Sequence, residues 1–131
     1  LLRNDVTVYR KSNNHYKEIL AQNLNMEPTK IKVGHDGEFI TFSKDNNLAT
    51  LDMESKTIRE WSVDGASFGW LDNDMLYSVN DSNLIVYDYD GLNRRGLSSG
   101  VSSRFPVTIT DDRWLYYISN ASLTREWLIE R

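Results

Sequence analysis

Residues 84–97 read LIVYDYDGLNRRGL, and this stretch decides how the rest of the chain is interpreted. Residues 84–87 are all aliphatic, β-branched or aromatic, which is typical of a strand covered on both faces. Asp90 and Gly91 follow, and these residue types tolerate the positive φ angles of tight hairpin turns. A second short strand over 94–97 would complete the unit. The stretch therefore predicts two antiparallel strands joined by a tight turn.

Other parts of the chain repeat at a fixed interval. An acid-containing turn followed by a strand-like run occurs three times, as HDGEFITFS, DNDMLYSV and DDRWLYYIS. Asp36, Asp74 and Asp112 lie in these runs and follow one another at intervals of 38 residues. The hairpin at 84–97 has a counterpart at 48–61. Internal repetition of this length predicts a fold built from stacked supersecondary units.

Each complete repeat reads as four short strands, called a to d in chain order. Complete repeats span 30–61 and 67–98. Incomplete repeats stand at both ends, because 5–23 reads as a c–d hairpin and 105–128 reads as strands a, b and part of c. Four antiparallel strands recurring at about 40 residues are typical of β-propeller blades. The sequence therefore predicts an all-β fold of about three blades in a single segment, 1–131.

The expected number of blades is lower than the roughly four to eight blades of compact propellers. Two explanations remain open. The chain is a portion of a longer propeller, or copies assemble so that strands at 105–118 of one copy join the hairpin at 6–20 of another. The second explanation predicts a homodimer that shares blades between chain ends. An open monomer would expose apolar blade faces to water, which is unfavourable.

Short helices are the alternative to two of the predicted strands, and the polar–apolar alternation of a third segment supports its assignment as a strand. Residues 16–24 and 123–128 resemble short amphipathic helices, but the phase of the repeat favours strands. Residues 56–61 alternate between polar and apolar side chains, which is typical of an outer strand with one solvated face. Strand d is therefore expected at the outer edge of each blade.

Composition excludes several classes of function. The chain has 131 residues and a net charge of −4, with 15 Lys and Arg against 19 Asp and Glu. Nucleic-acid binding is not expected, because phosphate contacts need clustered basic residues. No run approaches the roughly 18 apolar residues of a membrane span. The absence of cysteine excludes disulfides and thiolate chemistry. No cofactor is expected.

Two of the quoted motifs resemble a known family. HDGEFITFS resembles the PDG-x-x-I-A-F signature of TolB-type, WD-like β-propeller repeats, and residues 83–98 resemble their D-L-Y-V-x-D-x-D-G-x-N-x-R-x-L-T hairpin. The turns at 72–74 and 111–113 depart from the Pro-Asp-Gly pattern of the family. The resemblance implies a bacterial extracytoplasmic protein, periplasmic or at the cell surface. It also implies a protein-interaction scaffold more often than an enzyme.

One weak candidate metal site is present. Asp88, Asp90 and Asn93 form a D-x-D-G-x-N pattern that resembles half of a calcium loop. A complete loop needs about six oxygens, including a late bidentate glutamate that is missing here, so a plain hairpin turn is favoured. The two histidines, His15 and His35, lie in different repeats, which favours turn roles over a metal pair or a catalytic base. No catalytic residue is therefore predicted.

A candidate binding face follows from the blade topology. The b–c turns and d–a connections should emerge together, on a face rich in Ser, Asn and Asp, and propeller functions usually reside on such loops. Plain solvated turns are the alternative. Trp70 and Trp114 are expected to pack between blades. The binding-face candidates are Asp45, Asn46, Asn80, Asp81, Arg104, Asn120 and Trp127.

The leading functional hypothesis is a non-enzymatic propeller segment that binds a protein partner. One rival is a carbohydrate-binding, ion-binding or enzymatic propeller, which requires convergent carboxylates or a charged channel mouth. Clustered Asp or Glu with a bound ion or sugar at the central face would favour this rival, whereas a featureless polar rim would favour the scaffold. The other rival is a fragment of a larger propeller with no independent function.

Overall fold

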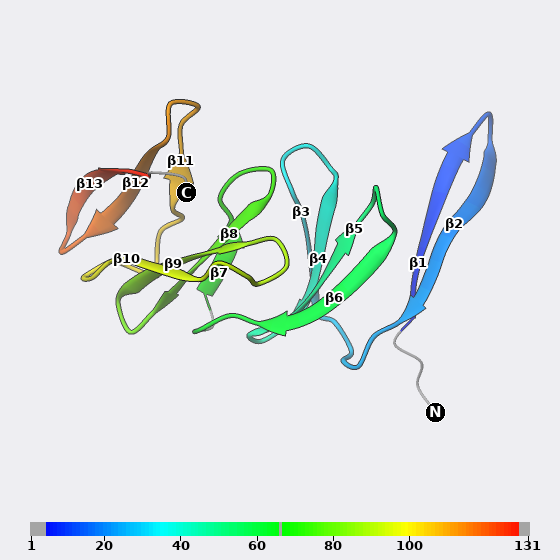
Figure 1. Cartoon of the computed structure of the whole chain (residues 1–131), viewed down its shortest axis with the longest axis horizontal. Coiled ribbons are helices and arrows are strands. Elements are labelled where there is room, and N and C mark those ends of the chain that lie inside the picture. The colour runs from blue at the N-terminus through cyan, green and yellow to red at the C-terminus, as the bar shows by residue number, and fades with distance from the viewer. Residues whose placement is uncertain (1–4, 66, 129–131) are drawn as a thin grey trace.

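The strands form four antiparallel sheets that follow one another along the molecule (Figure 1). This computed structural model describes residues 5–65 and 67–128, which contain thirteen strands and no helix. The expected segment 1–131 thus extends beyond the described residues at both ends, and Ala66 in one d–a connection also lies outside them. The all-β fold of antiparallel sheets is confirmed.

The sheets follow the repeats. The N-terminal sheet is a hairpin of β1 (Asp5–Ser12) and β2 (His15–Asn23). The two complete sheets are β3 (Lys30–Val33), β4 (Phe39–Lys44), β5 (Asn47–Asp52) and β6 (Thr57–Ser62), then β7 (Ser67–Trp70), β8 (Met75–Asn80), β9 (Asn83–Asp88) and β10 (Arg95–Ser98). The last sheet is β11 (Thr108–Ile109), β12 (Trp114–Ser119) and β13 (Ser122–Trp127). Both segments that resemble helices are strands.

Two-residue turns set the register inside each sheet. The first turn residue between strands b and c has a φ of 54° at Asp45, 47° at Asp81 and 49° at Asn120. Asp and Asn tolerate this left-handed conformation better than most residues. A two-residue loop fixes which residues face each other. Strands b and c consequently pair over their whole length in all three sheets.

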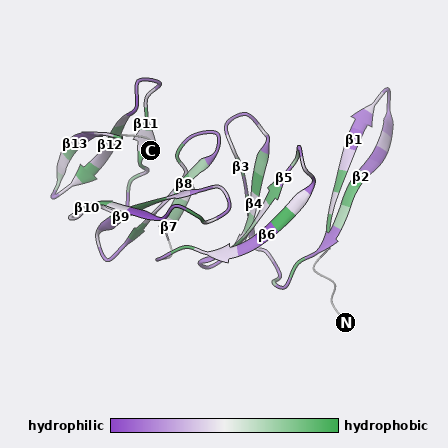
Figure 2. Cartoon of the chain, in the orientation of Figure 1, coloured by the Kyte–Doolittle hydropathy of each residue, from purple (hydrophilic) through white to green (hydrophobic). Residues whose placement is uncertain are grey.

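The sheets stack face to face through three apolar clusters. One lies between the hairpin and β3–β6, the second between β3–β6 and β7–β10, and the third between β7–β10 and β11–β13. Strand β9 serves two of them, because Leu84 and Val86 face the third cluster while Ile85 and Tyr87 face the second. Figure 2 shows hydrophobic segments along β4, β5 and β8, in contrast to the hydrophilic end of the hairpin. The central strands are covered on both faces, as expected.

The outer and inner strands also follow the expected order. Strand β6 lies at one edge of its sheet and is largely exposed. At the other edge, Lys32 Nζ of β3 donates to the Phe68 carbonyl of β7 at 2.7 Å, so the a strands of adjacent sheets approach each other.

Within the described residues, no helix is long and apolar enough to cross a membrane.

Two details of the last sheet differ from the expectation. Strand c is complete, since β13 pairs with β12 over six residues. Trp114 does not pack between sheets. Leu115 and Tyr117 take the buried face of β12, with exposed fractions of 0% and 5%, so Trp114 must point the other way. Its ring lies 6.3 Å from that of Trp127 and 4.3 Å from the guanidinium of Arg125.

Candidate functional site

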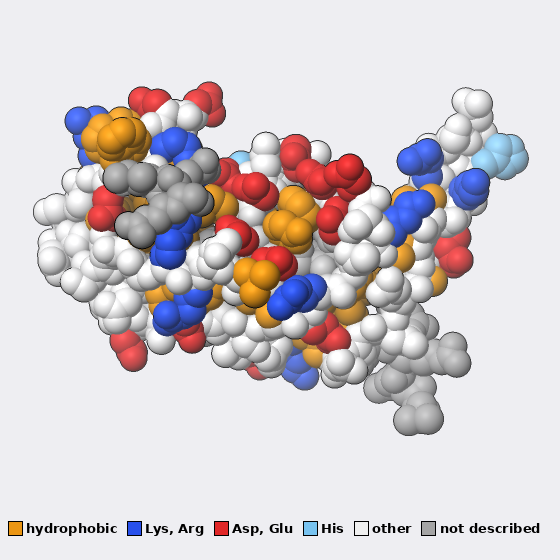
Figure 3. All heavy atoms as spheres, in the orientation of Figure 1, with side chains coloured by type: hydrophobic (Ala, Val, Ile, Leu, Met, Phe, Trp, Pro, Cys, Tyr) orange, Lys and Arg blue, Asp and Glu red, His pale blue; other side chains and the backbone are white. Residues whose placement is uncertain are grey.

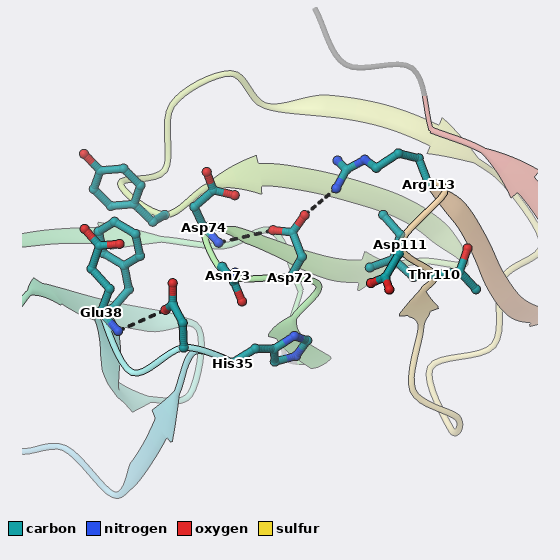
Figure 4. Close-up of a pocket in the computed structure, with 12 residues that line it drawn as sticks. His35, Glu38, Asp72, Asn73, Asp74, Thr110, Asp111 and Arg113 are labelled. Atoms are coloured by element: carbon teal, nitrogen blue, oxygen red, sulfur yellow. Dashed lines mark hydrogen bonds and ion pairs between the residues drawn. The ribbon is translucent and has the colours of Figure 1, made fainter.

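The turns between strands a and b of three successive sheets surround a hollow of about 640 Å³ (Figure 4). The turns come from 34–38, 71–74 and 110–113. Tyr89, from the turn between β9 and β10, forms part of the wall. The acidic side chains that line the hollow are Asp36, Glu38, Asp72, Asp74 and Asp111.

Local hydrogen bonds hold these acids in place. In the first turn, Gly34 N donates to the Phe39 carbonyl at 2.8 Å, and Asp36 Oδ1 accepts from Glu38 N at 3.0 Å. Gly37 has a φ of 78°, which glycine adopts without strain. In the second turn, Asp72 accepts from the backbone N of Asp74 at 3.2 Å. Short side chains that bond to nearby backbone N–H groups favour such turns.

An ion pair joins the second turn to the third. Arg113 Nη1 donates to Asp72 Oδ2 at 2.5 Å, and both side chains are mostly buried. Burial by itself acts to raise the pKa of Asp72, but the hydrogen bonds from Arg113 and from Asp74 N outweigh it, and the pKa lies below its ordinary value. This carboxylate therefore stays charged and links two sheets at the edge of the hollow.

We expect Asp72→Asn to lower the free energy of unfolding by about 2 kcal/mol at neutral pH, because Arg113 loses a charged partner. The folded-state pKa of Asp72 is depressed. Its contribution is thus complete above the ordinary carboxyl pKa of about 3.9 and is lost as pH falls through the lower folded pKa. Urea titrations across this pH range test the change. Asp81→Asn, on an exposed turn, is the control, and equal losses for the two variants would contradict the assignment.

Neighbouring acids make this surface strongly negative. The pKa of Glu38 is raised by a hydrogen bond with Glu54, by burial and by the charges of Asp36 and Asp52. The pKa of Tyr89 is raised by burial and by the acids around it. The Tyr89 ring stacks on Phe39, with 4.1 Å between ring centroids. In Figure 3, a group of acidic side chains lies over the middle of the molecule, and basic side chains lie on the hairpin and also over the other sheets. The hollow thus combines excess negative charge with an aromatic wall.

The expected binding face lies at the opposite end of the sheets. Asn46 and Val63 exchange hydrogen bonds, with Val63 N donating to the Asn46 carbonyl at 3.0 Å and Asn46 Nδ2 donating to the Val63 carbonyl at 3.2 Å. Asn120 N donates to the Gly100 carbonyl at 3.2 Å. The b–c turns and d–a connections therefore emerge together, as predicted, and part of their polarity serves the fold.

The individual candidates on that face differ. Asp45, Asp81, Arg104 and Asn120 are exposed, whereas Asn80 is half-buried. Trp127 is 60% exposed but does not belong with them. It lies opposite Trp114, at the far end of the sheet from Asn120, because β13 runs away from the b–c turn. The expectation that Trp127 belongs to the face of the b–c turns is therefore wrong.

The weak metal candidate forms a self-contained turn. Asn93 Nδ2 donates to Asp88 Oδ2 at 2.5 Å, and Leu92 N donates to Asp90 Oδ1 at 3.1 Å. Gly91, at φ 83°, would bring an added Cβ within 2.7 Å of the Trp61 ring on the neighbouring sheet. The motif therefore closes a hairpin and packs it against Trp61. In the part of the chain that the structure describes, no group of three or more His, Asp or Glu could hold a metal ion.

Sequence reasoning did not identify the hollow as a site. The motifs indicate only that the a–b turns connect strands, although Asp36, Asp74 and Asp112 follow one another at intervals of 38 residues. Equivalent positions in stacked repeats lie side by side in the fold. The presence of acids in every a–b turn was therefore the available signal for a shared negative surface, although Asp111 rather than Asp112 lines the hollow.

Comparison with known proteins supports the fold. No protein-family model and no curated protein matches the sequence. A solved structure, described as "Crystal Structure of the N-terminal Domain of Nup159", matches with a TM-score of 0.50 and 18% identity. The match covers 85% of this chain and 32% of that one. That domain is a β-propeller. The chain has a propeller-like fold and spans about a third of the length of this neighbour.

Proposed function

We propose that this chain is a non-enzymatic segment of a β-propeller that serves as a protein-interaction scaffold. The observation that carries the proposal is the hollow formed by the a–b turns, where five acidic side chains converge and Arg113 is the one cationic side chain among the described lining residues. Propeller functions reside on such loop surfaces. The quoted motifs further support assigning the repeats to the TolB-type, WD-like group.

The chemistry of the hollow specifies the kind of partner. The surface is negative, and its Arg113 is already engaged with Asp72. A basic segment of another protein, rich in Lys and Arg, complements this charge, and charge complementarity raises both the association rate and the specificity. The Tyr89 ring offers a face on which an arginine or lysine side chain can stack. We therefore propose an extended basic segment as the ligand class.

A peptide titration tests this assignment. We expect Asp36→Asn with Asp111→Asn to weaken binding of a fluorescent oligolysine peptide about fivefold, because two charges leave the hollow. Asparagine keeps the side-chain oxygen that the first turn uses, so the fold is retained. Fluorescence anisotropy at two salt concentrations gives the affinities.

The matched control is Asp45→Asn with Asp81→Asn. It changes the net charge by the same amount at the opposite end of the sheets, on exposed turns that suit asparagine. We expect less than about a twofold effect on affinity. If this pair weakens binding as much as the first pair does, the peptide senses only the net charge. If it weakens binding more, the b–c turn face is the binding surface.

A carbohydrate ligand is the second candidate. The specific observation in its favour is the stacked pair of Tyr89 and Phe39 beside carboxylates and the amide of Asn73, since sugars bind through aromatic faces and polar hydrogen bonds. A neutral oligosaccharide distinguishes the two candidates. Salt-independent sugar binding that Tyr89→Ala abolishes, together with no peptide binding, would replace the scaffold proposal.

A further inference from the structure

The first complete sheet, β3–β6, is covered over only half of the face that packs against the hairpin. Val6 of the hairpin is buried against Phe42 and Leu51 of β4 and β5, and partly buried Val8 and Leu20 join the same cluster. The hairpin has only two strands, and among the described residues no strand lies over the innermost strand, β3, on this side.

The uncovered part of that face is apolar. Ile31 is 65% exposed and Val33 is 56% exposed. Ile31 lies opposite Phe42, and Val33 lies opposite Ile40. Both therefore point to the same side of the sheet on which the hairpin covers β4 and β5. Ile31 and Val33, called the inner strip below, thus continue an existing sheet-to-sheet interface. Exposed apolar surface that continues a packed core is typical of a contact site.

The last sheet has a largely apolar face that no other described sheet covers. Leu115 and Tyr117 face β7–β10, so the alternate residues of β12 point away from the molecule. Tyr116 and Ile118 belong to this set, and Leu123, on β13, is 71% exposed. The residues of this open face are Trp114, Tyr116, Ile118, Leu123 and Trp127, and Arg125 lies among them over the Trp114 ring.

We propose that a second copy of this chain covers the inner strip with the open face of its β11–β13 sheet. Two observations point to a second copy. Among the described residues, no strands a and b join the hairpin, and the last sheet begins with strands of these two types. In addition, each of the first three sheets uses one face to cover the sheet that follows it in the chain. The open face is the equivalent face of the last sheet. The contact is head-to-tail, and two copies related by a closing rotation form a ring.

The number of strands at the two ends determines whether they can form one shared blade. The hairpin supplies strands c and d, whereas the last sheet supplies a, b and c, so the two ends duplicate strand c. A blade shared by simple addition of the two ends would hold five strands. The proposed contact is therefore the packing of one sheet face on another, and it requires no strand exchange. It goes beyond the peptide site, because it uses neither the acidic hollow nor its turns.

Analytical ultracentrifugation of the whole chain tests the proposal. We expect a species of twice the 15.2 kDa chain mass at tens of micromolar. Leu123→Arg with Trp127→Arg should abolish it, and so should Ile31→Asp. All three side chains are more than half exposed, so each variant can fold. Leu92→Arg, at an apolar side chain that is 49% exposed on another turn, should leave the dimer intact.

A mixing experiment separates this contact from a symmetric one. The Leu123→Arg, Trp127→Arg variant keeps its inner strip, and the Ile31→Asp variant keeps its open face. We expect the mixture to form a one-to-one complex, although each variant alone is monomeric. A monomeric wild-type chain, a dimer that these changes leave intact, or a mixture that stays monomeric would each overturn the proposal. A monomer would instead assign both surfaces to further blades or to another protein.

Discussion

We expect Leu115→Ala to lower the free energy of unfolding by about 3 to 4 kcal/mol. Leu115 has no exposed surface and packs in the cluster that joins β11–β13 to β7–β10, to which Leu84 and Val86 also belong. Truncation removes apolar contact area and leaves a cavity that two rigid sheets cannot close. The loss should be large because the side chain belongs to the interface between sheets.

The control for this change is Leu92→Ala. Leu92 is 49% exposed in the turn between β9 and β10, so its truncation should cost no more than about 0.5 kcal/mol. Urea unfolding of both variants, followed by circular dichroism and by tryptophan fluorescence, measures the difference. Similar stabilities for the two variants would show that Leu115 does not lie between packed sheets.

We expect Gly91→Ala to cost about 3 kcal/mol, which is more than a turn glycine usually contributes. Gly91 has a φ of 83°, and an added Cβ would lie 2.7 Å from the Trp61 ring of the neighbouring sheet. The ring cannot move away easily, because Trp61 Nε1 donates to Thr50 Oγ1 at 2.9 Å and the ring packs 5.3 Å from that of Tyr87. Strain in φ and overlap with Trp61 therefore add.

Gly37→Ala separates the two contributions. Gly37 has a similar φ of 78°, but its added Cβ meets nothing within 4 Å, so only the backbone strain of about 1 kcal/mol remains. Placing Gly91→Ala in a Trp61→Leu background should remove most of the excess cost. Equal costs for the two glycines, or an unchanged cost in that background, would contradict the contact between sheets.

Much of the fold could be predicted because its determinants are local. The strand-like run at 84–87, the Asp90-Gly91 turn and the acids recurring every 38 residues each specify short-range structure. Repetition then extends one assignment to the others, since each repeat packs on its neighbours in the same way. The four strands of each complete repeat formed where they were expected.

The rest depends on contacts between repeats. Successive side chains of β12 point to opposite faces, and Leu115 and Tyr117 take the buried face, so Trp114 lies on the open face. The large size of the Trp114 ring does not by itself indicate which face it takes. The acidic hollow arises only when turns from three sheets are stacked. Arg94, expected as an ordinary residue of strand d, precedes β10 and pairs with Asp64 of the preceding connection. Such pairings between repeats require the assembled geometry.

The central claim is that the repeats fold as successive sheets stacked face to face. Nuclear Overhauser spectroscopy of the methyl and aromatic protons tests it most directly. We predict cross-peaks between sheets in all three clusters: Val6 with Leu51, Trp61 with Tyr87, and Leu115 with Val86. Cross-peaks within the sheets, such as Phe42 with Ala49, should accompany them. A spectrum with the cross-peaks within the sheets but none between them would contradict the account.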